Sequence, residues 1–267
     1  MERMIKVVSC VLSLMVSWAC IGALADDNNG RKLNVLCVCA HPDDAELLCG
    51  GTLLKYHKQG HNIFIVLTTS GNTGSNTIRN VKEIGRIREA EMLASAKIYD
   101  AKVRFLRADD ERLFDTNEMR TKVLDAMRWA DPDVIFTHAP TDESPDHWTT
   151  AKIVCAMVIS LPGINQQSVE RPCTKRVSVF TCGAGLEIGF VPDVYVDISD
   201  ELESVCEAIN LHASQKIYMM NFKGSEDISL NKRKIAAFRG MQYGCQYAEG
   251  FCAWRVAGYL PDFKILP

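Results

Sequence analysis

An apolar run at residues 33–40 ends abruptly in the tetrapeptide His41-Pro42-Asp43-Asp44, and a helix-like pattern begins at Ala45. A fully apolar run that stops at a proline-containing turn is typical of a strand buried on both faces of a parallel sheet. Pro42 favours an extended conformation for the residue before it, so we expect the His41 imidazole to leave the strand towards the crevice beyond it. That crevice, at the carboxyl end of a parallel strand, is where α/β proteins keep their sites.

The adjacent aspartates of this turn indicate a bound cation. Two neighbouring carboxylates repel each other unless a cation or a proton neutralises them. The neutral imidazole nitrogen and the carboxylate oxygen are both good zinc ligands. An aspartate-rich helix N-cap with a partly exposed His41 explains the same residues, and the turn alone leaves both interpretations open.

The rest of the chain predicts a single α/β domain. Strands are expected at 63–69, 103–106 and 133–137, and a helical pattern follows each of them, as it follows the first strand. This alternation is typical of a Rossmann-like, doubly wound, mainly parallel sheet with helices on both faces, and we expect the strand order 3-2-1-4-5. Later segments predict strands at 177–182 and 194–198, a helix from 199, and, after one charged helix, an edge strand within 247–256. Asp115 and Glu118 are expected to open a helix as a capping box.

The composition argues against nucleic-acid binding. The chain has 267 residues, of which 47% are hydrophobic and 24% charged, with a formal net charge of −3. These values are ordinary for a globular protein, and no basic run is present to bind a phosphate backbone.

A second polar loop follows the strand expected at 133–137 and contains His138, Asp142, Ser144, Asp146 and His147. In the expected strand order, the first and fourth strands are neighbours, so the loops after them face each other. Two histidines and a carboxylate converging there make a three-ligand site with an open position, the catalytic type of zinc site. A further carboxylate beside it supplies the general base that a hydrolase needs.

The segments AHPDD at 40–44 and PDH at 145–147 resemble the LmbE-like (PIG-L) family of zinc-dependent de-N-acetylases, which remove acetyl groups from N-acetylglucosamine-type sugars. The resemblance covers most of the chain after the N-terminal segment. Supporting segments are Arg88-Glu-Ala-Glu91, Leu106–Glu111, His212-Ala-Ser-Gln215 and Tyr247–Phe251.

The resemblance implies that His41, Asp44 and His147 bind the metal, with zinc expected and another divalent ion such as Fe²⁺ as the alternative. It implies that Asp43 is the general base and that Arg88 and Asp110 contact sugar hydroxyls. Taken as residues alone, Arg88 and Asp110 are equally consistent with surface ion pairs.

Ser144 departs from the family pattern, which has His-x-Asp-His where this chain has Ser144-Pro-Asp-His147. A serine hydroxyl donates one hydrogen bond but cannot carry a positive charge or act as an acid near neutral pH. Either His138 or another group compensates, the metal alone polarises the carbonyl, or the enzyme is weak or altered in substrate. We count Asp43, Ser144 and Asp146 as the catalytic candidates, and we expect Asp146 to orient His147.

These observations predict a metal-dependent amidohydrolase that deacetylates an N-acetylated amino sugar. Two alternatives remain: a hydrolase of a different amide, and a non-catalytic carbohydrate-binding protein on a degenerate deacetylase fold. His212 lies on the apolar stripe of its helix and is expected to be a buried structural histidine.

The N-terminus is typical of a secretory signal peptide. Arg3 and Lys6 precede an apolar run at 7–24, and Ala23-Leu24-Ala25 provides a small-x-small cleavage site. We therefore expect a signal peptide at residues 1–25, a mature domain at 26–267 that is secreted or periplasmic, and no stable membrane span after cleavage; an uncleaved signal anchor is the alternative. Nine cysteines would remain, an odd number, with Cys245–Cys252 and Cys173–Cys182 as possible bridges.

If the signal peptide is cleaved as expected, the mature chain begins at Asp26. N-terminal sequencing of the protein from its native host checks this prediction. Soluble cytosolic protein that retains Met1 would contradict it.

Overall fold

The structure, a computed structural model, describes residues 31–183, 189–223, 227–255 and 261–267. Residues 32–267 form one compact unit. The expected signal peptide at 1–25 lies outside the described residues. Among the helices in the described ranges, none is long and apolar enough to cross a membrane.

A seven-stranded mixed sheet with the order β3-β2-β1-β4-β5-β7-β6 forms the centre of this unit. The first five strands are parallel, whereas β7 runs antiparallel to both of its neighbours. The predicted order 3-2-1-4-5 is confirmed. The strands are β1 (Asn34–Cys39), β2 (Asn62–Thr69), β3 (Lys102–Ala108), β4 (Val134–His138), β5 (Ser178–Cys182), β6 (Val194–Asp197) and β7 (Ala248–Ala253).

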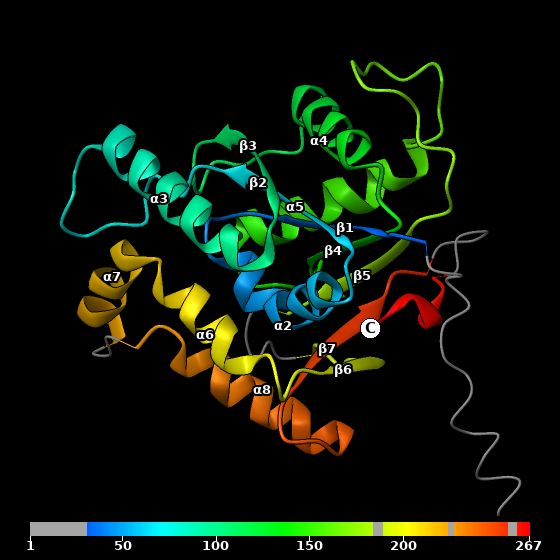
Figure 1. Ribbon diagram of the computed structural model, residues 1–267. Coiled ribbons are helices and arrows are strands. Elements are labelled where there is room, and N and C mark those ends of the chain that lie inside the picture. Colours follow the sequence, from blue (N-terminus) through cyan, green and yellow to red (C-terminus); the bar gives the residue numbers. More distant parts are fainter. Residues whose placement is uncertain (1–30, 184–188, 224–226, 256–260) are drawn as a thin grey trace, which may run out of the picture. The chain divides into compact units, whose positions relative to one another are not determined.

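Helices cover both faces of the sheet, as predicted. Helices α4 and α5 pack on one face, and α2, α3, α6 and α8 pack on the other (Figure 1). The helices are α2 (Asp44–Lys58), α3 (Val81–Ala96), α4 (Asn117–Ala130), α5 (Pro145–Met157), α6 (Leu202–Asn210), α7 (Ala213–Lys223) and α8 (Leu230–Tyr243). Three short 3₁₀ turns are η1 (Lys97–Tyr99), η2 (Val158–Ser160) and η3 (Phe263–Ile265).

The alternation of side chains along β1 explains why its sequence is apolar throughout. Val35 and Cys37 point into the core beneath α2, while Leu36 and Val38 point into the core beneath α4 and α5. Each of these four side chains is fully buried. A strand with a helix layer on each side has no solvent-facing positions, so polar residues begin only where it ends.

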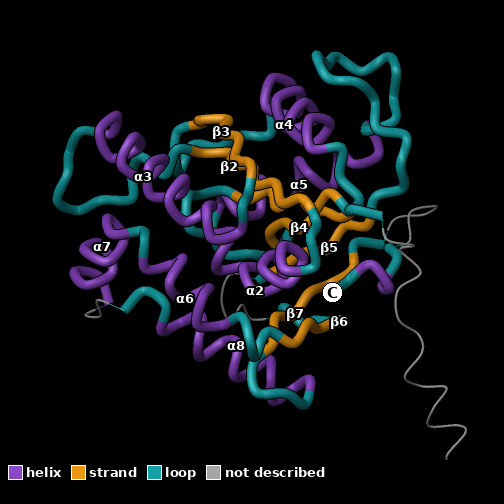
Figure 2. The backbone as a smooth tube through the Cα atoms, viewed as in Figure 1, coloured by secondary structure: helices purple, strands orange, loops and turns teal. Residues whose placement is uncertain are grey.

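The prediction of an edge strand within 247–256 was wrong. Strand β7 lies between β5 and β6, and β6 forms the edge of the sheet next to α8 (Figure 2). Glu249 of β7 is buried in this interior strand, although charged residues are rarely buried without a partner. Lys232 of α8 lies 2.5 Å from Glu249 and supplies that partner inside the protein.

Three local expectations are also corrected. Thr116, rather than Asp115, caps α4 by accepting the backbone N–H of Met119, and Asp115 pairs with Arg120 instead. Two helices, α7 and α8, stand where one was expected. All nine cysteines from Cys37 to Cys252 are free, so the structure contains neither of the suggested bridges.

Candidate active site

The site lies at the carboxyl ends of β1 and β4. These strands are neighbours in parallel register, with Val38 opposite Thr137, so the segments that follow them leave the sheet side by side. His41 belongs to the turn after β1, and Asp44 opens α2. His147 lies in the first turn of α5, which begins after the loop that follows β4.

The three predicted metal ligands converge. The Nδ1 atom of His41 lies 3.1 Å from Nε2 of His147. The Asp44 carboxylate lies 3.3 Å from the former atom and 3.5 Å from the latter. One ligand atom from each of the three residues lies within 4.8 Å of the ligand atoms of the other two. Asp44 is buried, whereas both histidines are partly exposed, so the site is reached from solvent on the histidine side.

A carboxylate contacts the other nitrogen of each imidazole. Asp110 Oδ1 lies 2.9 Å from Nε2 of His41, and Asp142 Oδ1 lies 3.0 Å from Nδ1 of His147. These carboxylates favour a proton on the nitrogen that they contact, which leaves the two facing nitrogens with lone pairs. Two lone pairs 3.1 Å apart, beside the Asp44 carboxylate, require a shared cation or a proton. The donor set therefore fits a divalent metal ion.

The electrostatic environment of His41 also favours a cation. Burial alone would lower the pKa of His41, but the Asp44 carboxylate and the hydrogen bonds with Asp110 and Asp146 raise it well above its ordinary value. The same field of negative charge that stabilises imidazolium stabilises a metal ion in its place.

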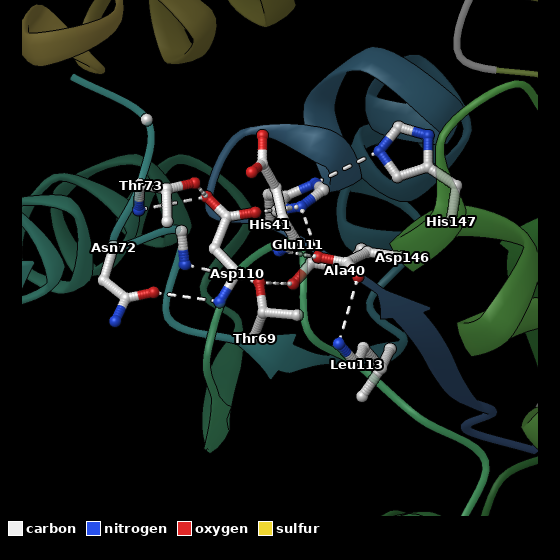
Figure 3. A network of polar contacts seen from close by, with 12 residues as sticks. Ala40, His41, Thr69, Asn72, Thr73, Asp110, Glu111, Leu113, Asp146 and His147 are labelled. Atoms are coloured by element: carbon white, nitrogen blue, oxygen red, sulfur yellow. Dashed lines mark hydrogen bonds and ion pairs between the residues drawn. The ribbon is translucent and has the colours of Figure 1, made fainter. Parts of the chain in front are cut away.

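Asp110 is itself fixed by the loop that follows β2. Its Oδ2 accepts hydrogen bonds from the backbone N–H and the hydroxyl of Thr73, at 3.3 and 2.8 Å. Its backbone N–H donates to the side chain of Asn72 (Figure 3). Thr73 and Asn72 could not be recognised as site residues from the sequence, because a polar glycine-rich loop carries no signal of the side chain that it contacts.

Asp146 does not contact His147, so the predicted orienting role belongs to Asp142. The Asp146 carboxylate accepts the backbone N–H groups of Glu111 and Leu113, at 2.7 and 3.2 Å, and lies 3.3 Å from Nε2 of His41 (Figure 3). Consecutive residues on a helix point in different directions, so Asp146 and His147 cannot face each other. Asp142 reaches His147 from the preceding turn.

Asp43 and Asp44 point apart because of an unusual backbone conformation. Asp43 has φ of +122°, a region that residues with a side chain rarely adopt. Such strain is typical of functional sites. Asp44 faces the histidines, while Asp43 Oδ2 lies 3.2 Å from the Arg88 guanidinium. Burial raises the pKa of Asp43, and the neighbouring Asp44 raises it further, although Arg88 opposes the change.

Arg88 is not part of a surface ion pair. Its side chain is buried and donates hydrogen bonds to the carbonyl groups of Gly71 and Pro42, at 3.1 and 2.7 Å. The guanidinium thereby ties the loop after β2 to the turn that carries Asp43. Both Arg88 and Asp110 have partners within the protein, and their contacts with a sugar stay predictions.

His138 is unsuited to replace the missing family histidine as an acid. Its ring is fully buried and stacks on His147 with a centroid distance of 4.0 Å. Its Nε2 atom accepts the backbone N–H of Ala40. Burial, with the nearby His147, lowers the pKa of His138 to about 4, so the ring is neutral near pH 7.

Ser144 forms the N-cap position of α5, and its hydroxyl makes no capping hydrogen bond. Its backbone N–H donates to Asp142 Oδ1, and its backbone carbonyl accepts from the N–H of Trp148. His212 is buried as predicted, with Nε2 3.6 Å from the equally buried Glu46.

Comparison with known proteins relates residues 36–158 to a known family. A family model described as GlcNAc-PI de-N-acetylase (PIG-L) matches residues 36–158, which include every predicted site residue. The diacetylchitobiose deacetylase of Thermococcus kodakarensis is 28% identical over 242 residues, covering 81% of each chain.

Two solved structures are similar as well. A conserved protein of Thermus thermophilus has a TM-score of 0.71 at 28% identity, covering 82% of this chain and 94% of that one. The N,N′-diacetylchitobiose deacetylase of Pyrococcus horikoshii has a TM-score of 0.72 at 26% identity, covering 85% and 86%. Residues 36–158 therefore carry a PIG-L (LmbE-like) family domain.

We expect His147→Ala to lose most bound metal, because it removes one of three ligands. Asp142→Asn should keep the ligand but weaken metal affinity by roughly 10- to 100-fold, because the amide holds the imidazole less firmly. Competition with a chelator measures both affinities.

The exposed Asp115, paired with Arg120, supplies a control of the same chemistry, and Asp115→Asn should leave metal affinity unchanged. Equal affinities for Asp142→Asn and the control would show that Asp142 has no role in the metal site.

Proposed function

We propose that this protein is a metal-dependent amidohydrolase that removes the acetyl group from an N-acetylglucosamine-type sugar or glycoconjugate. One observation carries the proposal: ligand atoms of His41, Asp44 and His147 lie within 4.8 Å of one another, and the neighbouring residue Asp43, which has a strained backbone, is not part of that group. The similarity to diacetylchitobiose deacetylases supports an N-acetylated amino sugar as the substrate.

The three ligands would hold a divalent ion, with zinc as the expected metal. A zinc ion bound in this way lowers the pKa of water and polarises an amide carbonyl. Three protein ligands leave a coordination position open, which a structural zinc site would not do.

Asp43 is the residue we assign to proton transfer. Arg88 contacts its Oδ2, so Oδ1 accepts the proton of the attacking water. The raised pKa brings this carboxylate closer to the working range of a general base. As water adds to the acetyl carbonyl and the C–N bond breaks, the nitrogen needs a proton, and the proton on Asp43 can meet this need. The products are acetate and the free amino sugar.

Asp43 can also supply the proton that Ser144 cannot give to the departing amine. A serine cannot protonate the departing amine, and the fully buried, neutral His138 is no substitute. One carboxylate that takes and returns the same proton makes a second acid unnecessary. Ser144 then contributes at most one hydrogen bond to the developing oxyanion.

The N-terminal sequence supports action outside the cytosol, on a secreted or periplasmic route. An exported enzyme would meet glycans or glycoconjugates of the cell surface or its surroundings rather than cytosolic precursors. We propose this location together with the activity.

The activity is tested by acetate release from N-acetylglucosamine, its oligomers and other N-acetylhexosamines, using purified protein loaded with Zn²⁺ or Fe²⁺. Asp43→Asn should retain metal while losing turnover by about 10²- to 10⁴-fold, because an amide cannot accept the water's proton.

Loss of metal in Asp43→Asn would overturn the division between base and ligand. Release of acid from a different amide, with none from the sugars, would favour the alternative hydrolase. Sugar binding with metal bound but no acetate release would favour a non-catalytic carbohydrate-binding protein.

The role of Ser144 is tested by two substitutions on one accepted substrate. Ser144→His should raise kcat by about tenfold, equivalent to roughly 1.4 kcal/mol of transition-state stabilisation, because it supplies a charged oxyanion partner. Ser144→Ala should change kcat little. A large loss in Ser144→Ala, with inactivity of Ser144→His, would instead show that the serine acts in a reshaped pocket.

A further inference from the structure

Helix α2 is interrupted one turn after Asp44. Cys49 lies inside the helix with non-helical angles, φ −145° and ψ 22°, and a kink separates the first turns from the rest. The segment before the kink carries Asp44, and the segment after it begins with Gly50 and Gly51. Helix kinks have identifiable causes, among them a side chain inserted into the backbone hydrogen-bond ladder.

Two buried charged side chains are inserted at this kink. In a regular helix the N–H of Gly51 would donate to the carbonyl of Leu47. Here that N–H donates to Glu249 Oε1 at 2.9 Å, and the Leu47 carbonyl accepts from Lys232 Nζ at 2.9 Å. Thr52 adds its N–H and hydroxyl to Glu249 Oε2, at 2.8 and 2.6 Å.

The two side chains inserted at the kink come from two other elements and form an ion pair with each other. Lys232 of α8 and Glu249 of β7 lie 2.5 Å apart, and each side chain is about 3% exposed. Each charge is compensated by the opposite charge of its partner, and each side chain also forms hydrogen bonds with α2. Figure 2 shows α8 and β7 next to α2.

The position of α2 after the kink is fixed by close packing. A Cβ atom on Gly51 would stand 2.5 Å from the side chain of Ile198, and one on Gly50 would stand 2.9 Å from Val205. These close contacts hold the long part of α2 against α6 and the end of β6, so we expect a change at the kink to be absorbed by the short first segment, which bears Asp44.

We propose that the Lys232–Glu249 pair is a positioning device for the metal site: by holding α2 open at Cys49, it sets the place of the Asp44 carboxylate relative to His41 and His147. Without the pair, the Leu47 carbonyl and the Gly51 N–H can bond to each other, the kink relaxes, and Asp44 moves. Both residues of the pair lie outside the stretch that the family model matches. The inference uses the metal site of the proposed function but does not depend on the reaction.

The test uses the full chain with Lys232→Met and Glu249→Leu combined, which removes both charges and keeps similar side-chain volumes. Two readouts report on Asp44 directly. One is hydrogen exchange of the His41 backbone N–H in metal-free protein, since this group donates to Asp44 Oδ2 at 2.6 Å. The other is Zn²⁺ affinity by chelator competition, with the Co²⁺ absorption spectrum as a record of geometry.

We expect exchange of the His41 N–H to accelerate at least tenfold, Zn²⁺ affinity to fall at least tenfold, and the Co²⁺ spectrum to change, all well below the unfolding temperature. Glu201→Gln is the matched control, because Glu201 pairs with Lys58 at the far end of α2, at 2.8 Å. It should alter neither readout. If the double variant does not fold, Thr52→Val, which removes one hydrogen bond to Glu249, should give smaller changes in the same direction.

Unchanged exchange of the His41 N–H in the folded variant would overturn the proposal. Faster exchange with unchanged Zn²⁺ affinity would overturn the link between the kink and the metal. A wild-type protein that binds no Zn²⁺ would overturn the metal assignment of the proposed function, and the exchange result would still decide whether the pair positions Asp44.

Discussion

Compensation of buried negative charge is the constraint on which this structure depends. Carboxylates gather at the ends of β1 and β4, where burial makes an uncompensated charge costly. Arg88 compensates the charge of Asp43, and the surrounding histidines compensate that of Asp44. Away from the site, Glu249 has Lys232. Asp44 depends on three histidines that are neutral unless protonated, and two of them present ring nitrogens 3.1 Å apart, which is why a metal ion fits at that point.

These charge pairs also determine where the backbone goes. Arg88 joins α3 to the loop after β2 and to the turn of Pro42, and it holds one oxygen of the Asp43 carboxylate. Lys232 and Glu249 join α8 and β7 to α2 and divide that helix. Elements near the end of the chain thus contact the helix that begins with Asp44, one of the three residues that converge at the site.

Much of the fold was predictable because the apolar pattern has one physical solution. Runs such as 33–40 and 133–137 need cover on both faces, which a parallel sheet between helix layers provides. The errors arose where a tertiary partner reversed a local preference. Lys232 allows Glu249 to lie in an interior strand, and Thr116 takes the cap position while Arg120 engages Asp115.

The sequence by itself determined the strand order of the parallel half and the convergence of the loops after β1 and β4, because these follow from a short-range pattern and a topological rule. The choice of His41, Asp44 and His147 within those loops came from the resemblance to a known family. Only the tertiary structure decided which carboxylate serves which histidine, that Arg88 is buried, and that α2 is opened by a distant ion pair. Such contacts join residues up to 198 positions apart, and no periodicity or spacing records a pairing over that distance. They depend on the packing of whole elements, which comes into existence only when the chain has folded.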